Sequence, residues 1–334
     1  MRSRSMAVWR LCLATSTILS LGLTIVRAFS EPIGPDQNWG LDRIDQPSLP
    51  LDGFYNYPLD GRGVNVYIID TGVLISHEEF AGRIQSVGTF DATSSGPVTT
   101  DATPNCDHAS RLDDHGTHVA DIAAGHTNGV AKGATIYVVK VCGPPARPLQ
   151  SQSAGVINAI HYIRAHNGSA PAVINISAGF IGTDVNDAIY AASNQFLFTL
   201  SAGCTADVAR HYGNAASRAI VAAGTDKTDR ASSDDQGAPI GYGDALALFA
   251  PALGITAAGA NPDTKYFVDE RDATCADSYA APHAAGVAAL YLQQNRGASP
   301  ASVRSVILDH AALIAGLPKR LLQVVPVKRS LNRA

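Results

Sequence analysis

Short runs of β-branched and other apolar residues alternate with helical patterns through the middle of the chain. This alternation is typical of parallel strands joined by crossover helices, so we expect an α/β fold with a mostly parallel central sheet flanked by helices. The expected strands are Val64 to Ile69, Thr135 to Val141, Ala172 to Ile176, Phe196 to Ser201 and Ala219 to Ala223. Each ends in a polar or glycine-containing cluster, and in open α/β sheets ligands gather at these carboxyl ends.

Helical spacing of apolar residues predicts the segments that connect the strands. It is seen at Val156, Ile157, Ile160 and Ile163, and two more helices are expected at roughly Ser278 to Gln294 and Ala301 to Ile314. The segment from Asp91 to Asp114 is rich in Ser, Thr and Asp and predicts a surface loop. The stretch from Lys319 to Ala334 predicts a loose, basic C-terminal tail.

Composition supports one globular domain and excludes several classes of protein. The 334 residues are 46% hydrophobic and 16% charged, so most of the chain is not disordered. The formal net charge is −4 and basic patches occur only at the two ends, so we expect no nucleic-acid partner. No fixed-period repeat indicates a solenoid.

The first 28 residues read as a signal peptide. Three arginines, Arg2, Arg4 and Arg10, precede an apolar stretch from Leu11 to Val26. Val26-Arg27-Ala28 then places small residues at the two positions that a signal peptidase recognises. The alternative is an uncleaved membrane anchor, but the stretch is short and rich in Ser and Thr. We therefore expect a secreted protein with no membrane attachment after the signal is removed.

The cysteines fit an oxidising compartment. Cys12 leaves with the signal peptide, and the four that remain, which allow three disulfide pairings, are Cys106, Cys142, Cys204 and Cys275. No CxxC or Cys/His spacing suggests zinc, and we expect no metal and no cofactor.

Three residues of catalytic type stand at the ends or beginnings of predicted elements. Asp70 ends an apolar strand, His115 opens the segment His-Gly-Thr-His-Val-Ala, and Ser278 enters a helix whose first N–H groups could face an anion. Their order along the chain, Asp, His, Ser, is one of the known orders of the hydrolytic triad. The structural alternative is a strand-end acid, a core histidine and a helix-capping serine that never meet.

Four motifs in this order resemble those of subtilisin-like serine proteases of the proteinase K branch. The resemblance spans about Asn38 to Pro318, and any one motif alone would be weak. The motifs are Trp39 to Ile44 for the start of the catalytic domain, Asp70-Thr71-Gly72, His115 to Ala120, and Ser278 through Gly286.

The resemblance implies a subtilisin-like fold and a role for each residue. A peptidase domain at 38–318 would lie between a short N-terminal segment at 29–37 and the tail at 319–334. Ser278 would attack the scissile carbonyl, His115 would move its proton, and Asp70 would hold the imidazole. His118 and His283 would be structural. A peptide or protein substrate would add as an extra strand beside Ser177-Ala178-Gly179.

Several positions depart from the family pattern. Cys204 stands where an asparagine amide supplies the oxyanion hole, and the loss of that donor in a subtilisin costs about 10²–10³ in turnover. Asp277 stands beside the nucleophile, where we expect burial and the charge of Asp70 to raise its pKa. Ala247 replaces a calcium-site aspartate of the relatives.

Two further expectations rest on the same resemblance. Cys106 and Cys142 lie near the positions of a disulfide in aqualysin-like relatives, which predicts that they are bonded. The family is normally made with an inhibitory prodomain, and the short stretch from Phe29 to Asn38 leaves no room for one after the predicted cleavage.

The sequence therefore leaves two alternative functions. The first is a secreted serine endopeptidase, acting as a monomer with reduced turnover, and it is favoured by the retained triad. The second is a catalytically silent pseudoprotease that binds peptides or proteins through the same groove, and it is favoured by Cys204 and Asp277.

Overall fold

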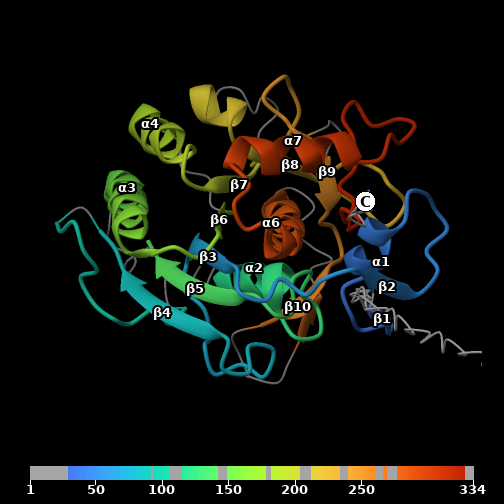
Figure 1. Ribbon diagram of the computed structural model, residues 1–334, viewed down its shortest axis with the longest axis horizontal. Coiled ribbons are helices and arrows are strands. Elements are labelled where there is room, and N and C mark those ends of the chain that lie inside the picture. Colours follow the sequence, from blue (N-terminus) through green and yellow to red (C-terminus); the bar gives the residue numbers. More distant parts are fainter. Residues whose placement is uncertain are drawn as a thin grey trace, which may run out of the picture.

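A seven-stranded parallel sheet forms the centre of the molecule (Figure 1). The computed structural model describes residues 29–91, 93–104, 115–141, 149–177, 182–203, 212–233, 240–259, 266–268 and 277–327. The strands lie in the order β4 (Ile84–Thr89), β5 (Thr135–Lys140), β3 (Asn65–Asp70), β6 (Ala172–Ile176), β7 (Leu197–Ser201), β8 (Ile220–Thr225) and β9 (Leu248–Pro251). This confirms the expected α/β architecture.

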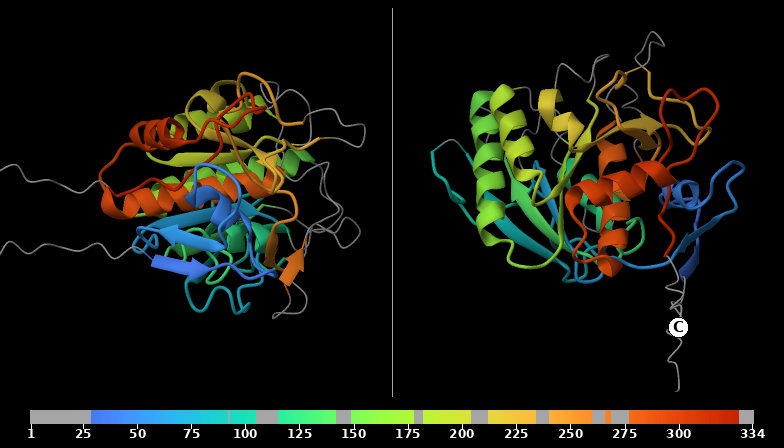
Figure 2. Two further views of the ribbon diagram at one scale, coloured as in Figure 1. Left: turned by 90° about the vertical axis from the view of Figure 1, so that its right-hand side faces the viewer. Right: turned by 45° about the horizontal axis from the view of Figure 1, so that its top comes forward.

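Helices cover both faces of the sheet (Figure 2). On one face lie α3 (Leu149–His166), α4 (Thr183–Ala192) and the short 3₁₀ helix η2 (Gly213–Ser217), and on the other lie α1 (Gly40–Asp45), α2 (His115–Ala124), α6 (Asp277–Gln294) and α7 (Pro300–His310). Two small antiparallel ribbons complete the fold: β1 (Phe29–Pro32) with β2 (Phe54–Tyr57), and β10 (Thr256–Ala258) with β11 (Tyr266–Val268).

The central strands β3, β6, β7 and β8 are largely apolar because both of their faces are buried. In β3, Val66 and Ile68 point to the core under α2 and α6, whereas Tyr67 and Ile69 point to the core under α3. Alternation of side chains along a strand produces this division. Continuous apolar runs are therefore the pattern that a covered parallel sheet requires.

The C-terminal tail is the main correction to the expected fold. The loose, basic tail predicted from Lys319 is wrong for residues 321–324, because Leu321 and Leu322 are fully buried and Val324 is 8% exposed. Leu321 forms bridges to Phe249 of β9 and to Ala312. The bridge to Ala312 also explains why α7 ends at His310, four residues before the predicted end.

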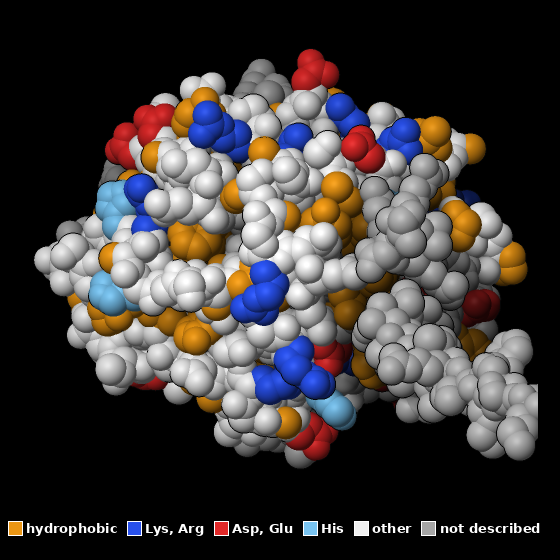
Figure 3. Space-filling view, in the orientation of Figure 1, with side chains coloured by type: hydrophobic (Ala, Val, Ile, Leu, Met, Phe, Trp, Pro, Cys, Tyr) orange, Lys and Arg blue, Asp and Glu red, His pale blue; other side chains and the backbone are white. Residues whose placement is uncertain are grey.

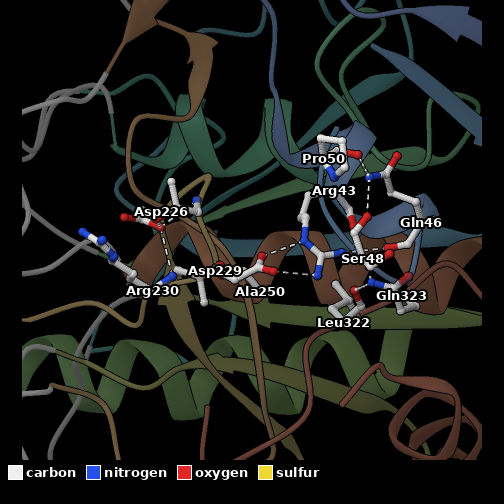
Figure 4. A network of polar contacts seen from close by, with 12 residues as sticks. Arg43, Gln46, Ser48, Pro50, Asp226, Asp229, Arg230, Ala250, Leu322 and Gln323 are labelled. Carbon is white, nitrogen blue, oxygen red and sulfur yellow. Dashed lines mark hydrogen bonds and ion pairs between the residues drawn. The ribbon is translucent and has the colours of Figure 1, made fainter. Parts of the chain in front are cut away.

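A buried ion pair ties the first helix to a loop beyond β8 (Figure 4). Arg43, whose side chain is 0% exposed, donates from Nε and Nη2 to the two carboxylate oxygens of Asp229, at 2.6 and 3.0 Å. Its Nη1 donates to the carbonyl oxygen of Gln46 at 2.7 Å. A two-pronged arginine–carboxylate contact of this kind fixes orientation as well as distance.

The surface seen in Figure 3 carries Lys and Arg side chains in small groups separated by neutral surface, with no continuous basic stripe. Among the described residues, none of the helices is long and apolar enough to span a bilayer.

Candidate active site

Two neighbouring strand ends position the predicted site. The sheet reverses its order at β3, which pairs with β5 on one side and with β6 on the other. Asp70 is the last residue of β3, and Ser177 follows the last residue of β6. Crevices at the carboxyl ends of such strands are where open α/β sheets bind ligands.

Asp70 and His115 are in direct contact. Nδ1 of His115 lies 2.8 Å from Oδ1 of Asp70, and the same oxygen accepts a hydrogen bond from the Thr71 N–H at 2.7 Å. The Asp70 side chain is 1% exposed and that of His115 is 14% exposed. Because Nδ1 is held by the carboxylate, Nε2 is the ring nitrogen that remains for proton transfer in a triad of this kind.

A glycine allows this contact. A Cβ atom on Gly116 would lie 2.2 Å from the carbonyl oxygen of Gly72, so only glycine lets the start of α2 approach the end of β3 so closely. The Gly116 N–H also donates to the hydroxyl of Thr71 at 3.0 Å. The Gly of the His-Gly-Thr-His motif is thus needed for the packing of helix against strand.

Ser278 lies in the first turn of α6 and makes a reciprocal pair of hydrogen bonds with Ser177. The Ser278 hydroxyl donates to the Ser177 carbonyl at 2.9 Å, and the Ser177 hydroxyl donates to the Ser278 carbonyl at 2.8 Å. The Ser177 side chain is thus engaged by the backbone of the predicted nucleophile, and its predicted role in the substrate-binding edge stays a prediction.

Several predicted residues lie outside the described part of the chain. They are Cys204 at the oxyanion position, Ala178 and Gly179 of the substrate edge, and the cysteines Cys106 and Cys142. Their roles stay predictions.

Tyr279 links Ser278 to the helix that carries His115, and it was not singled out from the sequence. Its hydroxyl is 3.2 Å from Nδ1 of His118, and its ring centroid is 6.1 Å from that of His115. Burial, reinforced by the nearby His115, lowers the pKa of His118 to about 3. His118 is therefore neutral at neutral pH, and its structural role stays a prediction.

His283 is held in one tautomer. Its Nδ1 lies 2.7 Å from the Tyr279 carbonyl, which can only accept, so Nδ1 carries the proton. Its Nε2 can then accept from the Asn38 amide at 3.1 Å. Burial lowers the pKa of His283 to about 4, so this ring is also neutral.

The carboxyl group of Asp277 is buried against the end of β8. Oδ1 accepts a hydrogen bond from the Gly224 N–H at 2.7 Å, and a Cβ atom on Gly241 would lie 2.1 Å from Oδ2. Burial raises the pKa of Asp277 to about 7, and the hydrogen bond from Gly224 partly opposes this shift. The expected increase is present, but Asp70 is not among its causes.

Metal-ligating side chains and surface cavities are the remaining features to compare with the position of these residues in the described ranges. Within them, no group of three or more His, Cys, Asp or Glu side chains could hold a metal ion. Surface cavities of about 380 Å³, beside Arg164 and Phe196, and about 670 Å³, beside Glu31 and Arg83, lie away from Asp70, His115 and Ser278.

Comparison with known proteins agrees with the fold and the motifs. The chain is 37% identical over 289 residues to an extracellular serine proteinase of Thermus sp. (strain Rt41A), covering 86% of this chain and 64% of that protein. It is 36% identical over 279 residues to alkaline serine exoprotease A of Vibrio alginolyticus, covering 82% and 47%. The chain thus spans about half to two thirds of the length of these relatives.

A solved structure gives the same result. A cold-adapted subtilisin-like serine proteinase superposes with a TM-score of 0.71 at 32% sequence identity, covering 87% of this chain and 100% of that one. The model of the subtilase family of peptidases matches residues 61–329. This match, together with the parallel sheet and the Asp70–His115 contact at its carboxyl edge, means that the chain belongs to the subtilase family.

Proposed function

We propose that this chain is the catalytic domain of a secreted serine endopeptidase that hydrolyses peptide bonds with reduced turnover. The contact of 2.8 Å between His115 and the buried Asp70 carries the proposal, because an imidazole that a carboxylate holds in this way is oriented to act as a base. Secretion is supported by the apolar N-terminal pattern and by the extracellular relative.

Each residue has one task in the proposed reaction. His115 removes the proton from the Ser278 hydroxyl as the oxygen attacks the carbonyl carbon, and then gives the proton to the leaving amine. Asp70 stabilises the imidazolium that exists between these steps. N–H groups at the start of α6 face the developing oxyanion. Cys204 stands in the sequence where the family has an amide donor, and because a thiol is only a weak donor we propose reduced turnover.

One contact favours the alternative, a pseudoprotease that binds peptides or proteins without cleaving them. The Ser278 hydroxyl donates its proton to the Ser177 carbonyl, whereas a nucleophile must give that proton to a base. The two functions differ in whether Ser278 can be activated.

A serine-directed fluorophosphonate probe tests this difference on the purified full chain. The endopeptidase proposal predicts labelling that is lost in Ser278→Ala and Asp70→Asn and kept in Ser305→Ala, which removes an exposed hydroxyl on α7. If folded wild-type protein is not labelled at any pH from about 5 to about 10, the pseudoprotease is established instead.

A substitution at the oxyanion position distinguishes an endopeptidase with reduced turnover from a pseudoprotease. Cys204→Asn restores the amide donor and should raise peptide hydrolysis by roughly 10²-fold. Ser278→Ala in the same background is the blank for contaminating protease.

A further inference from the structure

Helix α6 cannot satisfy the carbonyl of Ser278 in the regular way. In an α-helix, each carbonyl accepts a hydrogen bond from the N–H four residues later. The fourth residue after Ser278 is Pro282, which lies inside α6 and has no N–H. A donor from outside the helix can take that place.

The side chain of Ser177 provides this donor. Its hydroxyl donates to the Ser278 carbonyl at 2.8 Å from a position just beyond the end of β6. Ser177 is only 2% exposed, so water does not compete for the contact. The backbone of Ser278 is thus anchored to the central sheet.

Two residues behind Ser177 fix the direction of its hydroxyl. Asn175 donates from Nδ2 to the Ser177 oxygen at 2.9 Å, so the Ser177 proton is directed to Ser278. Thr199 donates to Oδ1 of Asn175 at 2.9 Å, which fixes the orientation of the amide.

The pairing of β6 with β7 places the side chains of Thr199, Asn175 and Ser177 next to one another. Asn175 and Thr199 are directly paired in register between β6 and β7, and both are 0% exposed. Side chains two residues apart on a strand share a face, which puts Asn175 and Ser177 on one side. In such a buried chain each hydrogen bond depends on the next, because an unpaired polar group there is costly.

We propose that Thr199, Asn175 and Ser177 are positioning residues for Ser278, and that they supply the hydrogen bond that Pro282 withholds from its carbonyl. This inference rests on the proposed function, since it assigns these residues to the placement of the nucleophile. They act through the Ser278 backbone and do not touch the reacting atoms. A displacement of about 1 Å in a nucleophile can cost roughly 10²-fold in rate.

A double-mutant cycle between Ser177 and Pro282 tests the contact without any need for activity. Ser177→Ala should lower the midpoint of urea unfolding in the wild-type background, because it leaves the Ser278 carbonyl without its donor. In the Pro282→Ala background the new N–H can donate to that carbonyl, so the same substitution should lower the midpoint by less than half as much.

A matched control exists at the end of α4. Ser193 is buried and its hydroxyl also donates to a helix carbonyl, that of Ile189, at 2.7 Å. Ser193→Ala should therefore lower the midpoint equally in both backgrounds. An equal loss for Ser177→Ala in both backgrounds would overturn the proposal.

Thr199 provides the kinetic test, since a residue with 0% exposure cannot contact substrate. Thr199→Val removes the hydroxyl at nearly constant shape and should slow fluorophosphonate labelling of folded protein by roughly tenfold, whereas Thr199→Ser should restore the rate. A normal rate in Thr199→Val would show a purely structural role and overturn the positioning role. An unlabelled wild type would refute the proposed function, and the urea cycle would then decide alone whether the contact exists.

Discussion

The hydroxyl of Tyr279 lies 3.2 Å from Nδ1 of His118, so the residue that follows Ser278 is joined to the helix that begins with His115. The same Tyr279 ring packs against the His115 ring. Helices α2 and α6, which carry His115 and Ser278 of the proposed triad, are thus held together by a side chain that is 7% exposed.

Replacement of Tyr279 should separate these two contacts. Tyr279→Phe keeps the ring against His115 and loses the hydrogen bond, so we expect a loss of about 1 kcal/mol in unfolding free energy and nearly normal labelling of Ser278. Tyr279→Leu also loses the ring, and labelling should fall. Urea unfolding and labelling rates measure both, and equal labelling in the two variants would contradict a role for the ring.

The buried histidines should make the fold sensitive to acid. The folded pKa values of His118 and His283 are about 3 and 4, whereas an unfolded histidine has a pKa of about 6.5. Their contribution to stability is therefore present above pH 6.5. As the pH falls from 6.5 towards 4, each should cost about 1.4 kcal/mol per pH unit.

A variant without one of these rings tests this slope. The glutamine in His118→Gln cannot bind a proton. Between pH 4 and pH 6.5, the slope of the unfolding free energy against pH should therefore correspond to about one bound proton fewer than in the wild type. An unchanged slope would show that His118 is already charged in the folded state.

Asp277 should act in the opposite sense. Its pKa is about 7 in the folded chain and about 3.8 in the unfolded chain, so its contribution to stability is full below pH 3.8 and is lost as the pH rises to 7. The loss over this window is about 4 kcal/mol. Asp277→Asn should therefore match the wild type near pH 4 and be more stable at pH 8.

An exposed carboxyl group provides the control for this change. Asp244 is exposed, and Asp244→Asn should leave the pH dependence of urea unfolding as it is in the wild type. If the unfolding free energies of Asp277→Asn and the wild type change in parallel from pH 4 to pH 8, Asp277 is ionised in the folded protein and a pKa of about 7 is wrong.

Arg43→Met should destabilise the fold strongly, because it leaves Asp229 without its buried partner. Removal of one member of a buried ion pair costs about 3–5 kcal/mol. The double variant Arg43→Met/Asp229→Asn removes the unpaired charge and should recover a large part of the loss in thermal unfolding. A single variant that unfolds at the wild-type temperature would show that the pair contributes nothing.

Much of the central sheet could be predicted because a strand that is covered on both faces is a mostly apolar run. β6 was predicted with its observed bounds, and β3, β5, β7 and β8 were within two residues. The positions of Asp70 and His115 followed from the motifs and the strand ends. Local sequence is sufficient for these strands because each apolar run has about the same length as the strand that it forms.

Features that depend on distant neighbours could not be predicted in this way. The direction of the Asp277 carboxyl group is set by Gly224 and Gly241, more than thirty residues earlier in the chain. The burial of Leu321 depends on β9, and the sequence around it looks like a basic tail because Lys319 and Arg320 precede it. The sequence does hold a signal for the role of Ser177. Pro282, four residues after Ser278, has no N–H, so the Ser278 carbonyl needs a hydrogen-bond donor from outside the helix.

The return of the C-terminal segment onto β9 has a consequence for solubility. Both outer strands of the sheet have backbone groups covered: Phe249 of β9 bonds to Arg320 and Leu322, and Thr89 of β4 bonds to Val98 and Thr99. Uncovered edge strands pair readily with other extended chains, including copies of the same protein. Removal of the chain from Arg320 onward would expose one of these edges, so a truncated protein should self-associate even where its core still folds.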